Sequence, residues 1–268
     1  KFHQLHPAKQ GESARIPLLD NYTRVTEIAD RLAPLMGSNG SSKSFQDFAY
    51  GIIYHAANAL DYLGEPIRLT TIQKVIASDR KGLALRVMRK HFTDSIGEDW
   101  EIKYASALEK LDPDPLTAMA MFYNNGNNIK NKVVEGMIEF ALHDEGHYTK
   151  MVVSLRPVLT ALTASPLDDL LSPIEVDEER PVDSKIVDLA DLMESGGCIY
   201  VSLDSLTDAT SAGFISRLLL AEMAAIAGER YNNGVGDSRR ITIANDEVHA
   251  SLENNDALLN ILAQGRAA

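Results

Sequence analysis

The chain has 268 residues, of which 45% are hydrophobic and 24% charged, so it is long enough for one large or two ordinary globular domains. Its net charge of −12 has the wrong sign for a surface that holds nucleic acid over its whole area. Any contact with DNA is therefore expected at a local basic patch or pore, or outside this chain. The single cysteine, Cys198, excludes a disulfide framework and fits a reducing compartment.

The N-terminal residues 1–22 predict a strand and an irregular connection. Phe2–Leu5 is typical of the end of a strand, because Pro7 cannot continue the hydrogen-bond ladder. No run approaches the ~18–20 apolar residues of a membrane helix, since Arg217 and Glu222 interrupt the longest one. The chain begins at Lys1 rather than Met, so we expect an internal piece of a longer protein, with any membrane anchor outside it.

From residue 23 to residue 165 apolar residues recur at helical spacing, which predicts an all-helical domain. Helices are expected at about 25–35, 45–63, 70–76, 83–92, 100–111 and 129–165. A basic cluster, 86–91, lies in one of them. A DNA or protein contact is one interpretation, and a solvated helix face that balances the acidic remainder is favoured.

A pair of histidines in this part could bind zinc. His143 and His147 are spaced i and i+4, as on one face of a helix. The zincin motif requires a Glu directly after the first His, whereas Glu145 is out of register and Gly146 weakens the helix. A metal-dependent enzyme is therefore the weakest functional hypothesis.

After a proline-bracketed acidic linker, 166–181, the pattern changes to α/β. A helix is expected at 186–193, a buried strand at 198–202, and a long helix from about 209 to 231 that Thr207 or Asp208 caps. Cys198 is expected as a buried strand residue rather than a nucleophile. Two strands are too few for a stable sheet, so the remaining strands are expected outside the chain.

The second strand, 239–247, ends on two adjacent carboxylates. Ile241 and Ile243 alternate with smaller residues, and Asp246 and Glu247 follow at the end where ligands of parallel sheets bind. In ATPases, the Walker B motif has this form, with the Asp on Mg²⁺ and the Glu activating water. A strand that stops at a solvated acidic turn is the alternative, and on this motif alone it is the favoured one.

A hydrolase of this class also requires a phosphate loop, whose amides and lysine bind the nucleotide phosphates. The chain contains no Gly-Lys dipeptide. We therefore expect that this chain by itself does not hydrolyse ATP.

The order of these segments resembles the TraD/TraG class of type IV secretion coupling proteins, the ATPases of conjugative DNA transfer. The resemblance spans nearly the whole chain and is most specific in the strand and loop Ile199–Asp208 combined with the Asp-Glu strand. The segments that carry it are Phe2–Pro7, Arg24–Ala29, Phe45–Tyr50, Leu171–Pro173, Ile199–Asp208, Asn245–Glu247 and Gln264–Arg266.

The resemblance implies an α/β fold: part of a RecA-like P-loop ATPase motor domain with a large all-α domain inserted. Residues 1–22 and 166–268 would belong to the motor domain, and 23–165 would be the insertion. Such proteins are anchored at the cytoplasmic face of the bacterial inner membrane and act as homohexamers. They receive a relaxase–DNA complex, meet accessory transfer proteins, and pass single-stranded DNA to the type IV secretion channel.

The resemblance also implies roles for individual residues, with ATP and Mg²⁺ as cofactors. Asp246 would hold Mg²⁺ through water, Glu247 would activate the attacking water, and Arg266 would act as an arginine finger on a neighbouring subunit's nucleotide. Gln264 would contact the nucleotide. The alternative function is a non-hydrolytic helical module that recognises relaxase or an accessory protein, because an acidic chain favours basic protein partners over bare DNA.

Overall fold

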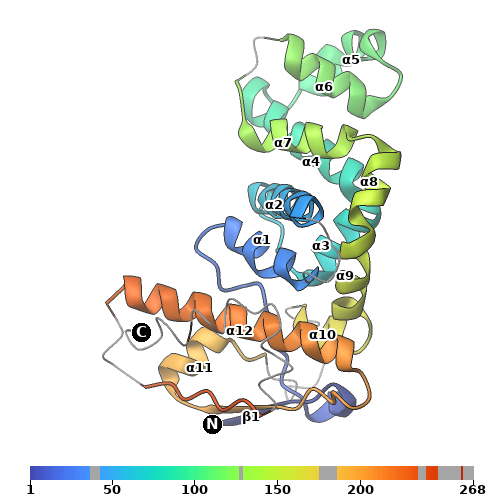
Figure 1. The fold of residues 1–268 in the computed structure, drawn as a ribbon. Coiled ribbons are helices and arrows are strands. Elements are labelled where there is room, and N and C mark those ends of the chain that lie inside the picture. The colour runs from blue at the N-terminus through green and yellow to red at the C-terminus, as the bar shows by residue number, and fades with distance from the viewer. Residues whose placement is uncertain (37–42, 127–128, 175–185, 235–239, 247–260, 262–268) are drawn as a thin grey trace.

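The structure, a computed structural model, describes residues 1–36, 43–126, 129–174, 186–234, 240–246 and 261. These residues form an elongated stack of helices, with α5 and α6 at one end and α12 with the two strands at the other (Figure 1). The stack is built from α1 (Thr26–Leu32), α2 (Lys43–Leu63), α3 (Leu69–Lys74), α4 (Arg80–Ile96), α5 (Trp100–Leu111), α6 (Pro115–Asn125), α7 (Lys132–Leu142), α8 (Glu145–Met151), α9 (Leu155–Thr163) and α10 (Leu167–Leu171).

The opposite end of the molecule carries the strands and the longest helix. Its elements are β1 (Phe2–Leu5), α11 (Leu189–Ser195), β2 (Cys198–Val201) and α12 (Ala209–Asn232). Short 3-10 turns lie at Pro7–Glu12, Ala33–Met36 and Val152–Ser154, and a π-helical turn, Val75–Asp79, joins α3 to α4.

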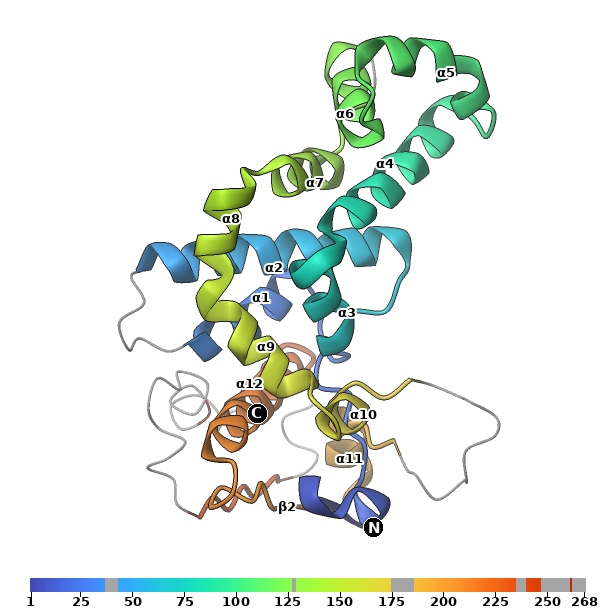
Figure 2. The same ribbon diagram turned by 90° about the vertical axis from the view of Figure 1, so that its right-hand side faces the viewer.

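Helix α2 lies at the centre of the stack, where it packs against α1, α4 and α7. Its buried face carries Ile52, Ile53, Ala56 and Leu60, at the three- and four-residue spacing that places side chains on one side of a helix. Each fully buried Ile or Leu contributes about 1.5–3 kcal/mol through removal of apolar surface from water. In the second view, α8 and α9 run across α2 toward α10 and α12 (Figure 2).

The predicted helices are largely present, but the helix expected at 129–165 is divided into α7, α8 and α9. The reason is local: the Asp144 carboxylate accepts a hydrogen bond from the His147 backbone amide at 2.7 Å and so caps a new helix, α8. His143, just before it, has an extended ψ of 139° that ends α7. Short polar side chains compete in this way with a continuous helix.

The predicted fold class is wrong. Of the residues that the structure describes, 70% are helical and 4% lie in a two-stranded parallel sheet, so the described fold is mostly all-α and not a RecA-like α/β motor domain. Within the described part, residues 240–245 of the predicted second strand belong to no strand. Ile241 and Ile243 are 40% and 39% exposed, so their alternation does not mark a buried strand. Two alternating apolar residues give a weak strand signal when no neighbouring strand supplies a ladder.

The predicted domain boundaries stay predictions, but two observations bear on how the segments join. Strand β1 pairs with β2, so the N-terminal residues lie beside the segment that follows the predicted linker. One continuous cluster of buried hydrophobic residues extends from Leu5, through the helical stack, to Ile226 in α12.

Among the described residues, one helix, α12, is long and apolar enough to cross a membrane by length and composition. This observation is weak support for a membrane span, because buried core helices have the same composition. Here α12 packs against α1 and α9, and Glu222 in its middle has no exposed surface.

Candidate functional site

The two strands bring the segments that follow them to one edge of the small sheet. They pair in parallel, with Phe2 opposite Cys198 and Leu5 opposite Val201. Leu5 and Val201 face the hydrophobic core, whereas Phe2 and Cys198 are exposed, so the prediction of a buried Cys198 is wrong although it does lie in a strand. Ligands of parallel sheets bind beyond the carboxyl ends of the strands, which directs attention to the segments after Leu5 and Val201.

A pocket of about 690 Å³ lies where these two segments meet α9. The pocket is lined by Pro7, which follows β1, and by Leu203, Asp204, Thr207, Asp208 and Ser211, which follow β2. Its volume lies in the range of small-molecule sites. The polar side chains among its lining residues are Arg156, Thr160, Ser165, Asp204, Thr207, Asp208 and Ser211.

The loop on the strand side of the pocket is a tight turn centred on Asp204. Asp204 has a φ of 52°, the left-handed region that few residues other than glycine adopt. Its carbonyl accepts hydrogen bonds from the amides of Thr207 and Asp208, at 3.0 and 3.1 Å. Its carboxylate accepts one from the Thr207 hydroxyl at 3.1 Å. Non-glycine residues in this conformation cost of order 1–3 kcal/mol and cluster at functional sites.

Asp208 ends this turn and begins α12. Its carboxylate accepts a hydrogen bond from the Ser211 amide at 3.0 Å, which confirms the predicted helix cap. Hydrogen bonds from the Ser211 hydroxyl and amide lower the pKa of the Asp208 carboxyl, because both donors stabilise its charged form. The negative charge of the Asp208 carboxylate therefore already lies at the positive, N-terminal end of the α12 dipole.

The opposite wall comes from α9, which contributes the exposed side chains of Arg156 and Thr160. The pocket thus has one guanidinium on the α9 side and two carboxylates, Asp204 and Asp208, on the α12 side. Two carboxylates at the helix N-terminus oppose the binding of a phosphate there. Within the described ranges no group of three or more His, Cys, Asp or Glu residues could hold a metal ion.

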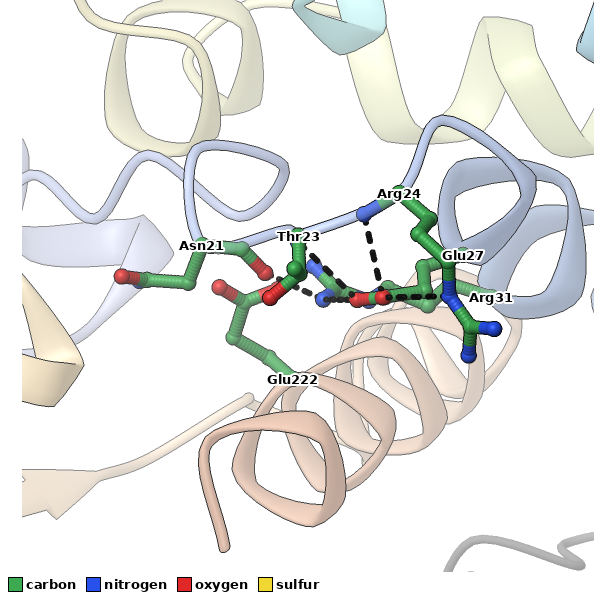
Figure 3. A network of polar contacts seen from close by, with 6 residues as sticks. All are labelled: Asn21, Thr23, Arg24, Glu27, Arg31 and Glu222. Atoms are coloured by element: carbon green, nitrogen blue, oxygen red, sulfur yellow. Dashed lines mark hydrogen bonds and ion pairs between the residues drawn. The ribbon is translucent and has the colours of Figure 1, made fainter. Parts of the chain in front are cut away.

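A buried polar network fixes the middle of α12 to α1 (Figure 3). The Arg31 guanidinium donates hydrogen bonds to the Glu222 carboxylate and to the Asn21 carbonyl, and lies 3.5 Å from the Glu27 carboxylate. The side chains of Arg31 and Glu222 are 4% and 0% exposed. Burial raises the pKa of Glu222 to about 7, although Arg31 acts to lower it.

The histidine pair does not form a zinc site in the described residues. His143 Nε2 and His147 Nδ1 lie 2.6 Å apart and share a hydrogen bond across the junction of α7 and α8. Glu145 is held instead by Arg80, whose Nη2 lies 2.5 Å from its carboxylate. No third side chain joins the pair to complete a metal site in the part of the chain that the structure describes.

The basic cluster on α4 is paired within the chain. Arg86 bonds Glu65 and Asp79, at 3.0 and 3.1 Å. Arg89 lies 2.8 Å from Glu101, and Lys90 lies 3.1 Å from Asp94. These contacts agree with the predicted solvated helix face for Arg86, Arg89 and Lys90, whereas His91, the fourth basic residue of the cluster, is buried.

Of the four predicted site residues, one lies in the described part of the chain. Asp246 is exposed and sits in a turn rather than at the end of a strand, and it is not among the residues that line the pocket. Glu247, Gln264 and Arg266 lie outside the described residues. Their roles stay predictions.

Sequence reasoning missed Arg156 and the Arg31–Glu222 pair. Glu222 gave a signal, because a lone carboxylate inside a long apolar helix is either exposed on one face or buried with a partner. Arg156 gave none, since an arginine on a helix of ordinary composition does not reveal which surface it faces. Comparison of the chain with protein-family models, with curated proteins and with solved structures found no match.

Proposed function

We propose that this chain acts in conjugative DNA transfer, as part of a coupling protein that recruits a relaxase–DNA substrate and powers its transfer into a type IV secretion channel. The observation that carries this proposal is the form taken by Ile199–Asp208, the most specific part of the resemblance. This segment makes β2, the strained Asp204 turn and the cap of α12, and its loop lines the pocket at the carboxyl edge of the parallel strands. A strained turn beside a pocket favours a functional role over a structural one.

The hydrolytic part of the proposal concerns the longer protein. Asp246 would hold Mg²⁺ through water, Glu247 would activate water, Arg266 would stabilise transition-state charge on a neighbouring subunit's nucleotide, and Gln264 would contact that nucleotide. The phosphate loop would come from outside this chain. We place the assembled protein, as a homohexamer, at the cytoplasmic face of the bacterial inner membrane, in contact with accessory transfer proteins.

The second candidate function is recognition without hydrolysis, by the helical stack. The pairing of Arg86, Arg89 and Lys90 with carboxylates of the same chain favours it, because the neighbouring carboxylates offset these positive charges and weaken their attraction for DNA. With a net charge of −12, a basic surface of relaxase or of an accessory protein is a better electrostatic match than single-stranded DNA alone.

The deciding test is ATP hydrolysis by the full-length protein, with and without single-stranded DNA, beside a Glu247→Gln variant. Loss of the activating carboxylate should lower turnover by at least ~10²-fold while nucleotide still binds, because general base catalysis contributes that much or more. Glu229→Gln is the matched control, since Glu229 is an exposed glutamate of α12 and its loss should leave turnover unchanged.

Unchanged turnover in Glu247→Gln would remove this residue from the mechanism. If the folded, assembled protein hydrolyses no ATP, the recognition function replaces the motor function. That alternative is then measured directly, as binding of purified relaxase to the isolated protein at physiological salt.

A further inference from the structure

Helix α12 connects the pocket to the buried polar network. Its first turn, with Asp208 and Ser211, lines the pocket, and Glu222 lies eleven residues beyond Ser211 on the same helix. Eleven residues of α-helix span roughly 16 Å. A rigid helix of this length transmits a displacement at one point to the other.

Among the described residues, the groups that hydrogen-bond Glu222 come from α1 and from Asn21 in the segment just before it. Its partner is Arg31 of α1, 191 residues away in the chain, and Arg31 also contacts Glu27 and the Asn21 carbonyl (Figure 3). In the part of the chain that the structure describes, Asp188, the residue that caps α11, also acts on Glu222, and it opposes ionisation. Two carboxylates on α1 and α12 therefore share one buried guanidinium.

A pair of this kind is poorly explained by stability alone. Removing two charges from water costs about as much as their attraction returns, so well-packed apolar residues often serve a fold as well or better. Removal of one partner, in contrast, leaves a buried charge and is strongly unfavourable. Such a pair specifies one arrangement of the elements that carry it, here α1 and α12.

We propose that the Arg31–Glu222 contact is a latch that sets the position of α12 against the helical stack and so the position of the pocket wall. The latch would regulate the pocket on which the proposed function is based. It rests on the proposed function in one respect, namely that the pocket is a binding site. Opening the latch moves Glu222 into water and releases the first turn of α12 from α9.

The burial of the Glu222 carboxyl decides the direction in which the latch responds to pH. In the closed state the pKa of Glu222 is raised to about 7, and in an open, solvated state it returns toward 4.5. The closed state therefore binds the proton more tightly, and the latch is firmest below the open-state value. It loosens as pH rises from about 4.5 and Glu222 ionises through about 7.

Hydrogen exchange read by mass spectrometry tests this proposal on the whole chain without a ligand. Protection factors, corrected for intrinsic exchange, are followed for residues 203–215 between pH 6 and pH 8.5. The wild type should lose about 10-fold in protection over this range, the factor that linkage gives for the two values of pKa. Glu222→Gln should show no pH dependence, and Glu229→Gln, at an exposed position two turns further along α12, should behave as wild type.

Arg31→Met should lower protection of 203–215 at pH 8.5 by at least ~10-fold, and should affect α7 much less. If that variant fails to fold, the double variant Arg31→Met with Glu222→Leu replaces the pair by apolar side chains and should be folded and independent of pH. Wild-type protection that does not vary with pH would overturn the proposal. So would equal changes in 203–215 and α7, or a pH dependence that survives in the double variant. None of these outcomes depends on ATP hydrolysis, so they are distinct from failure of the Glu247 test.

Discussion

Two arginines of this protein make similar contacts in opposite surroundings. Arg31 meets Glu222 and Glu27 between α1 and α12, and Arg86 meets Glu65 and Asp79 on the outside of α4. The side chains of the Arg31–Glu222 pair are 4% and 0% exposed, whereas those of Arg86 and Glu65 are 39% and 38% exposed. In each cluster, one guanidinium serves two carboxylates.

The difference teaches that burial, rather than contact geometry, decides what an ion pair does. Around Arg86, water and salt screen the charges, and either side chain can be solvated when the pair opens. Around Arg31, an opened pair leaves a charge in a low-dielectric interior. The outer cluster, formed by Arg86, Glu65 and Asp79, adds solubility and modest stability. The inner cluster, formed by Arg31, Glu222 and Glu27, specifies one packing of α12.

The largest expected effect is the loss of Arg31. Arg31→Met should lower the free energy of unfolding by about 3–5 kcal/mol at pH 8, because Glu222 loses its buried partner. Urea denaturation followed by circular dichroism measures it. The double variant with Glu222→Leu should recover most of the loss, and a double variant as unstable as the single one would argue against burial as the cause.

The next effect is the pH dependence of stability. Glu222 has a folded-state pKa raised from 4.5 to about 7, so its contribution is fully present below about 4.5 and is lost as pH rises through about 7. At about 1.4 kcal/mol for each unit of pKa, the change is at most about 3.5 kcal/mol. Denaturation of wild type and Glu222→Gln at a series of pH values measures the difference, which should narrow as the pH falls.

A smaller effect is expected at the start of α12. Asp208→Ala should cost about 1 kcal/mol, because the Ser211 amide loses its cap. The matched variant Asp208→Asn keeps an acceptor and should retain most of the stability. Because hydrogen bonds lower the pKa of Asp208, its contribution should be present at neutral pH and fade in acid, opposite in sign to that of Glu222.

The smallest effect is expected for the outer cluster. Arg86→Gln should change the free energy of unfolding by less than about 1 kcal/mol, and the change should shrink further in high salt. Thermal denaturation at low and high ionic strength checks both statements. A loss of stability as large as that of Arg31→Met would contradict the conclusion that burial decides the effect of an ion pair in the two clusters.

The local features of this protein follow from its amino-acid sequence alone. Helical periodicity placed the segments of the stack, and the polar residue Asp208 placed the start of α12. These are short-range properties, because a helix and its cap form among residues within about four positions of each other. The same reasoning failed at Asp144, whose capping of α8 a continuous apolar pattern conceals, and at Ile241 and Ile243, where alternation did not produce a strand.

Three features depend on the tertiary structure: the pairing of β1 with β2, the pocket beyond their carboxyl ends, and the contact of Arg31 with Glu222. Each of these features joins residues that are far apart in the chain. Local propensity does not predict which distant residue a side chain will contact after folding. Burial adds the second reason. The exposed fraction of Glu222, and with it the raised pKa and the latch that we propose, exists only once α1 and α12 have packed together and removed water from between them.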